Sequence, residues 1–219
     1  MNHLWKDNWN ETKANHEAWW KGEGLVLASW GTGLARPSAP RDGILPPPAP
    51  ATKAAWHTDP AFVAARLRAD MAAKVWPADM VPLCWPDLGT VSLAPYLGAI
   101  SNYGDNNVWY QHTLADIENG KPLTFDPANP AVRQLEATTR AVVAAAQGNY
   151  FAGRPALVPN LDVRAEVRGT QDLLIDMLES PDWVHAKPAE IDDAWKIAFD
   201  RMRDIIKLPD GSMVFGYFM

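Results

Sequence analysis

Apolar residues recur at spacings of three and four in several stretches of the chain, which predicts helices with one buried face. Three helix starts are marked by a capping side chain before a proline: Asp59-Pro60, Asn129-Pro130 and Ser180-Pro181. The capping side chain accepts a hydrogen bond from a free backbone N–H in the first turn of the helix. Proline has no N–H, and at the first helical position an N–H would have no partner within the helix, so proline is tolerated there. The positions on the four expected stripes are Val63, Leu67, Met71 and Val75; Val132, Leu135, Thr139, Val142 and Ala146; Val163, Val167, Thr170, Leu174 and Leu178; and Ile191, Trp195, Ala198, Met202 and Ile205. Pro188 is expected to interrupt the helical stretch 180–207.

Short apolar runs between these helices predict buried strands at 25–30, 81–85, 155–159 and 213–218. Strands that alternate with helices favour a parallel sheet with helical crossovers, so the predicted fold class is α/β. Residues 1–24 are expected to form an N-terminal helical extension. The proline-rich stretch 36–57 is expected to be an excursion that forms no regular element.

The last expected strand, 213–218, is apolar and has no helix after it in this sequence. Such a strand would leave unpaired backbone groups at the edge of a sheet, and an exposed edge binds other strands. We therefore expect the chain to associate with itself through 213–219.

The composition limits the class of protein. The hydrophobic fraction of 47% and the charged fraction of 21% are typical of a folded domain. A net charge of −6 provides no basic field for nucleic acid or for anionic lipid. One cysteine, Cys84, allows no internal disulfide and no cysteine-based zinc cluster, and a buried structural thiol is the favoured interpretation. We expect no metal, no cofactor and no membrane span, and a reducing, cytoplasmic location.

Three segments together resemble the uroporphyrinogen-decarboxylase superfamily. Residues 159–184 are similar to the family's strand, turn and "G-x-E-x-L-L-x-D-L-x-x-x-P-E-x-V" helix pair, with Gly169, Asp176, Pro181 and Val184 at matching positions. Residues 85–99 resemble the loop and helix after an early strand, and residues 19–23 resemble the opening of a bacterial branch of the superfamily.

The resemblance implies the N-terminal half of a (β/α)8 barrel, as a single domain over residues 1–219, because a complete barrel needs about 250 residues. It also implies an enzyme, either a carboxy-lyase or a corrinoid-linked methyltransferase, that acts on a small organic or tetrapyrrole-type substrate. The methyltransferases hold zinc through a "H-x-C" motif, which this sequence lacks.

Asp87 matches the aspartate with which the decarboxylases hold the pyrrole N–H groups of the substrate. A carboxylate there would stabilise the positive charge that develops on a pyrrole ring as carbon dioxide leaves. An equally good interpretation is that Asp87 caps a helix that begins near Thr90.

Other family residues are absent. Of the two arginines that bind substrate carboxylates, the first is replaced by Gly33, and the nearest to the second is Arg36, one position away. The family's tyrosine is replaced by Ala165. Losing these groups removes carboxylate recognition, so uroporphyrinogen itself is not the expected substrate.

Asn160, Asp162 and Arg164 follow an expected strand and are candidate substrate-binding residues at the mouth of a barrel. The alternative is that Asp162 caps the next helix and that Arg164 is solvated on its first turn, and for Arg164 the sequence favours this alternative. Eleven tryptophans also allow a carbohydrate-active barrel, since indole rings stack on sugars. A non-catalytic half-barrel that self-associates is the third possibility.

Overall fold

The computed structural model describes residues 4–28, 34–35, 40–86, 93–104, 107–117, 122–159, 161–186 and 188–214. The chain is mixed α/β. Its helices are α1 (Trp9–Trp20), α2 (Lys53–Thr58), α3 (Pro60–Ala72), α4 (Pro130–Ala146), α5 (Leu161–Arg168), α6 (Thr170–Glu179), α7 (Pro181–Ala186) and α8 (Pro188–Ile206), with 3-10 turns η1 (Arg41–Gly43) and η2 (Ala94–Leu97). Its strands are β1 (Leu34–Ala35), β2 (Lys74–Val75), β3 (Leu83–Cys84), β4 (Ile100–Tyr103), β5 (Val108–Gln111) and β6 (Phe151–Ala152).

The helix starts expected from the caps are confirmed. The Asp59 carboxylate accepts hydrogen bonds from the backbone N–H groups of Ala61 and Phe62 at the start of α3. Asn129 accepts from Ala131 N at the start of α4, while its amide nitrogen donates to carbonyls of η2. Helix α7 ends at Ala186 and α8 begins at Pro188, and the residue between them, where the interruption expected at Pro188 would fall, lies outside the described residues.

The strands are shorter than expected and pair differently. Only β3 and β6 pair in parallel, whereas β1–β2 and β4–β5 are antiparallel, so the described strands do not form the mostly parallel sheet that we expected. Expected strand 81–85 is present as β3, but 25–28 and 155–157 have no strand, Val158 forms only an isolated bridge, and 213–214 is irregular. Residues 29–30 and 215–218 lie outside the described residues. The described strands form no closed barrel.

The proline-rich stretch mostly agrees with the expectation. Residues 44–50 have no regular structure, and η1 is a single turn. The irregular stretch expected over 36–57 extends too far along the chain, however, because helix α2 already begins at Lys53. Thr52 accepts a hydrogen bond from Ala55 N and so starts α2 with a cap that the sequence reading overlooked.

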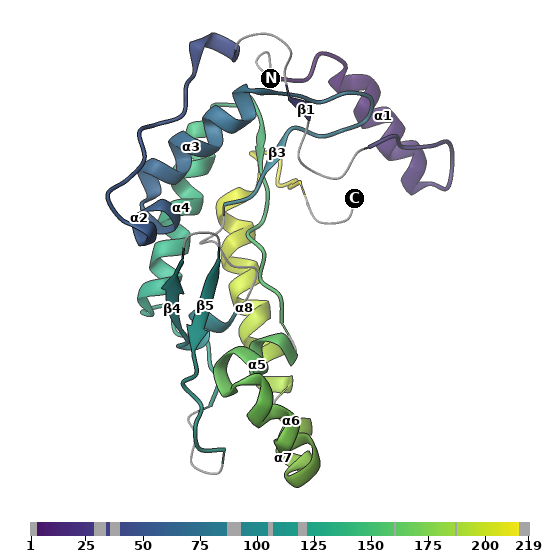
Figure 1. Ribbon diagram of the computed structural model, residues 1–219. Coiled ribbons are helices and arrows are strands. Elements are labelled where there is room, and N and C mark those ends of the chain that lie inside the picture. The colour runs from purple at the N-terminus through teal and green to yellow at the C-terminus, as the bar shows by residue number, and fades with distance from the viewer. Residues whose placement is uncertain are drawn as a thin grey trace.

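Helix α4 joins two hydrophobic cores. Near its start, Val132 and Leu135 pack in a cluster with η2, α5 and α8; near its end, Val142 and Ala146 pack in a second cluster with α3 and with the chain around β3. In Figure 1, α3 and α4 lie side by side, α1 lies at one end of the molecule, and α5, α6 and α7 form the other end. Among the described residues, none of the helices combines the length and the apolar composition needed to cross a bilayer.

The N-terminal segment is attached through a buried carboxylate. Asp79 is 5% exposed and accepts hydrogen bonds from Asn15 Nδ2 of α1 at 2.8 Å and from Leu27 N at 2.9 Å. The bond from Leu27 lowers the pKa of Asp79 most, with a smaller contribution from Asn15. Lys6 donates to the carbonyls of Trp76 and Ala78 on the same loop, and burial lowers its pKa. Leu27 is therefore held by both the side chain and the backbone N–H of Asp79, and residues 25–28 form no strand.

This attachment predicts acid sensitivity. The pKa of Asp79 is lower in the folded than in the unfolded chain, so its stabilising effect is complete above the unfolded value of about 4 and is lost as the pH falls through the lower folded value. We expect Asp79→Asn to reduce the free energy of unfolding at pH 6 and the difference from wild type to shrink towards pH 3. Urea unfolding followed by circular dichroism measures this, and a difference that is the same at both pH values would contradict it.

Candidate functional site

The parallel strands β3 and β6 direct two chain segments towards the same end of the pair. Phe151 N donates to Pro82 O and Gly153 N donates to Cys84 O, each at 2.8 Å. The two segments are still close together at Gly153. A Cβ atom at this position would lie 2.9 Å from atoms of the Leu83 and Trp85 side chains, so a larger residue would not fit without a shift. The segments that follow β3 and β6 thus leave side by side, at the carboxyl ends where α/β folds bind ligands.

These two segments meet again further along. Leu93 N donates to Val158 O at 3.3 Å. This bond links the segment that follows β3 to the segment between β6 and α5. Residues 87–92 and Asn160 lie just outside the described parts of the chain, as does Arg36, so the positions of the side chains of Asp87, Asn160 and Arg36 are not described.

Asp162 and Arg164 have opposite environments although both are in α5. Asp162 is exposed in the first turn of the helix. Arg164 is 4% exposed and donates to the carbonyl of Val184 in α7, and burial lowers the pKa of its guanidinium group. The favoured prediction that Arg164 is solvated is therefore wrong, because α7 returns over this face of α5. Arg164 holds α7 against α5 and does not face solvent.

Arg154 is a cation that the sequence interpretation did not single out. It lies two residues after β6, is half-buried, and its guanidinium group lies 5.4 Å from the centre of the Phe199 ring. Burial lowers the pKa of Arg154. The sequence signal was present, since a charged residue follows the apolar pair Phe151-Ala152 after a single glycine. It was missed because the strand was expected at 155–159, after this arginine.

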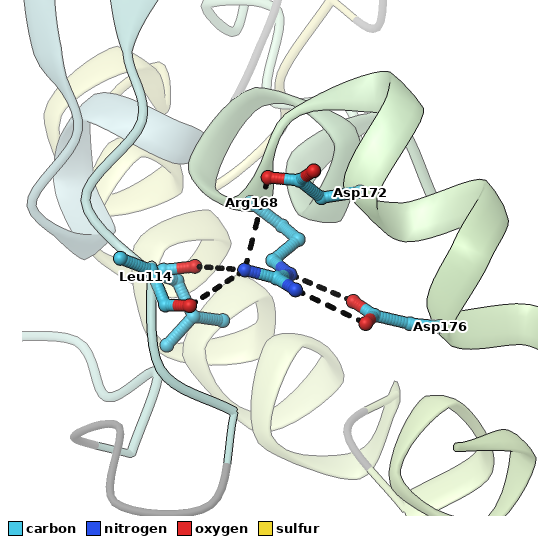
Figure 2. Close-up of polar contacts among 5 residues, drawn as sticks. Leu114, Arg168, Asp172 and Asp176 are labelled. Carbon is cyan, nitrogen blue, oxygen red and sulfur yellow. Dashed lines mark hydrogen bonds and ion pairs between the residues drawn. The ribbon is translucent and has the colours of Figure 1, made fainter. Parts of the chain in front are cut away.

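The strongest described polar cluster surrounds Arg168, at the junction of α5 and α6 (Figure 2). Its Nε and Nη2 atoms donate to the two carboxylate oxygens of Asp176 at 2.7 and 3.1 Å, and Nη1 donates to Ala115 O at 2.7 Å and more weakly to Leu114 O at 3.4 Å. Asp172 lies 3.8 Å from Nη1. The bond to Asp176 raises the pKa of Arg168. Arg168 thus joins α5, α6 and the backbone of residues 114–115, and we describe this cluster as a structural clamp.

Gly169 makes the junction possible. Its φ of +101° is disfavoured for any residue with a Cβ, and a Cβ would lie 2.8 Å from the His112 ring. The stripe expected to continue from Val163 to Leu178 is therefore broken here. The expectation that residues 161–178 are largely helical is confirmed, but as two helices.

A groove of about 320 Å³ lies elsewhere, between α2 and the end of β4. Lys53, Trp56, His57 and Gly104 are among its lining residues. His57 stacks on Tyr103, with ring centroids 5.5 Å apart and planes 20° apart. Such a wall could stack against a planar ring. Of the candidate residues that the structure describes, neither Asp162 nor Arg164 lines it.

The cysteine lies in the hydrophobic core. Cys84 is buried, and burial raises the pKa of its thiol, which agrees with the expected buried structural thiol. Within the described ranges, no three His, Cys, Asp or Glu side chains cluster as metal ligands would.

Comparison of the chain with models of protein families, with curated proteins and with solved structures gave no match.

The clamp predicts strong coupling between Arg168 and Asp176. Their side chains are 14% and 7% exposed, so removing one partner leaves the other charge buried and should cost about 3–5 kcal/mol. Arg168→Met combined with Asp176→Leu should cost much less than the sum of the two single changes. Chemical unfolding of all four proteins gives the coupling energy.

The pair Lys196–Asp193 is a suitable control, because both of its side chains are more than half exposed. The same double-mutant cycle on Lys196 and Asp193 should give no measurable coupling. Additive effects at Arg168 and Asp176 would show that the clamp does not hold the junction.

Proposed function

We propose that this chain is a uroporphyrinogen-decarboxylase-like β/α module, the N-terminal part of a (β/α)8 barrel, that binds a small organic or tetrapyrrole-type substrate other than uroporphyrinogen. The reaction proposed is the loss of carbon dioxide from a carboxylated substrate, with methyl transfer as the alternative within the same superfamily.

The observation that supports this proposal best is the parallel pair β3–β6, which has α4 in the connection between its strands. In barrels of this kind the residues that contact substrate follow the carboxyl ends of parallel strands. Asp87 follows β3, and Arg154, Asn160 and Asp162 follow β6. The hydrogen bond between Leu93 and Val158 keeps these two segments together.

Each candidate residue has a role in the proposal. The Asp87 carboxylate accepts hydrogen bonds from pyrrole N–H groups. As the bond to the carboxylate carbon breaks, its electrons enter the ring, which a proton has made cationic, and Asp87 stabilises that charge. Carbon dioxide leaves, a proton takes its place on the carbon, and the ring then loses the proton that it had gained. Arg36 and Arg154 are the cations proposed for a second substrate carboxylate, and Arg154 also donates to Pro155 O and lies over the Phe199 ring. Asn160 and Asp162 line the mouth.

Binding of porphobilinogen, a pyrrole with two carboxylate side chains, tests this proposal. We expect isothermal titration calorimetry to detect binding to the 219-residue chain, and Asp87→Asn and Asp162→Asn each to weaken it by about tenfold, since a hydrogen bond to a charged group contributes about 1.5–3 kcal/mol.

Asp182→Asn is the matched control. Asp182, like Asp162, is an exposed aspartate at the second position of a helix, so both changes remove the same favourable interaction with a helix N-terminus. Asp182→Asn should leave the affinity unchanged. Equal effects at Asp162 and Asp182, or no effect at Asp87, would contradict the proposed site.

Self-association through the apolar residues 213–219 is a separate part of the proposal. Val214 packs beside Val81, Leu83 and Phe151, so the described beginning of this run lies near the strands β3 and β6. We expect sedimentation equilibrium at micromolar concentration to show a dimer. A single species near 24.2 kDa that unfolds cooperatively would contradict this expectation.

A further inference from the structure

The outer face of α6 is apolar. Leu174, Ile175 and Leu178 are 58%, 50% and 85% exposed, and Met177 beside them is 41% exposed. Single exposed apolar residues are common on protein surfaces, but four large ones within five positions of one helix form a contiguous patch. Such patches mark surfaces that bind other molecules.

The inner face of the same helix shows that this orientation is fixed. Leu173 is buried among its neighbours and Asp176 is held by Arg168, so these two side chains define the side that faces the protein. In Figure 1, α6 and α7 lie at the end of the molecule farthest from α1. A partner could therefore reach the patch without displacing another part of the described chain.

The surroundings of the patch are acidic. Asp172 and Glu179 lie three positions before and four positions after Ile175, so they share its row on the helix. Asp172 also forms an ion pair with Arg168 at 3.8 Å, so it adds less negative charge to this row than Glu179 does. Asp182, in the first turn of α7, adds another exposed carboxylate. The helices α6 and α7 contain no lysine and no arginine. The patch is thus an apolar ridge bordered on one side by carboxylates.

We propose that this face of α6 binds an amphipathic helix of a partner protein that has an apolar stripe and lysine or arginine residues along one flank. Apolar side chains at helical spacing match the packing of one helix on another. The row of carboxylates requires cations in the partner, and it fixes the register and direction of the helix.

A second copy of the chain fits this face less well. Two α6 helices packed antiparallel across a two-fold axis would bring the row of Asp172 and Glu179 opposite the same row of the other copy. Like charges facing each other across an interface oppose association. The inference is independent of the proposed enzymatic function, which concerns the segments after β3 and β6.

Binding of designed peptides tests the proposal. The probe is a labelled helical peptide of about 20 residues with a leucine stripe flanked by lysines, and the matched peptide has glutamate in place of each lysine. Fluorescence anisotropy with the whole chain should detect the lysine peptide only. Leu174→Ser with Leu178→Ser should weaken this binding at least about tenfold, as the loss of central interface residues does.

Two further variants separate the patch from general stickiness. Leu25→Ser with Leu27→Ser is the matched control, because these leucines are 69% and 58% exposed near α1, and it should leave binding unchanged. Glu179→Lys with Asp182→Asn should shift the preference towards the glutamate peptide.

Equal binding of both peptides, or equal loss in both leucine pairs, would overturn the proposal. So would a dimer in sedimentation equilibrium that Leu174→Ser with Leu178→Ser converts to a monomer, because a second copy would then be the occupant.

Discussion

The ion pair between Arg168 and Asp176 determines how the last third of the chain is arranged. Its two parallel hydrogen bonds fix both the distance and the angle between α5 and α6, and the same guanidinium group holds the backbone at Leu114 and Ala115. Two consecutive helices and the backbone of residues more than 50 positions earlier therefore meet at one side chain. Arg168 can fill this position only because Gly169 turns the chain where a residue with a Cβ would be strained.

Local signals in the sequence predicted the helices well and the strands badly, for a physical reason. A cap such as Asp59 or Asn129 acts within three residues, so its effect can be recognised from the sequence alone. The strands β3 and β6 have two residues each, and they exist because they pair with each other across 67 intervening positions. Apolar composition favoured 155–159, but proline at both ends of that run removes backbone donors, and pairing occurs earlier, at Phe151 and Ala152. Periodicity also could not reveal the break at Gly169, since the stripe continues on both sides of it.

The candidate site was predictable only in part. The position of Asp162 at an exposed helix start agrees with the sequence, but the burial of Arg164 depends on α7, which comes seventeen residues later and whose return no local pattern indicates. The segment with the most specific family resemblance also turns out to be architectural. Of its matching positions, Gly169 turns the chain, Asp176 binds Arg168, and Pro181 begins α7. The chemistry of the proposed enzyme therefore depends on the segments after β3 and β6, and not on the residues that carry most of the resemblance.

The exposure of the α6 face has an energetic consequence. Turning the helix by about 100°, one residue step, would move Leu174 into the buried place of Leu173 and Met177 into that of Asp176, while Leu173 itself would become exposed. The net hydrophobic gain would be that of about one side chain, on the order of 1–2 kcal/mol. The same rotation would withdraw Asp176 from Arg168 and leave the Arg168 charge buried and unpaired, at a cost of about 3–5 kcal/mol. The cost exceeds the gain, so the clamp keeps the leucines facing outward. An apolar face that an ion pair holds in solvent in this way is expected of a binding surface.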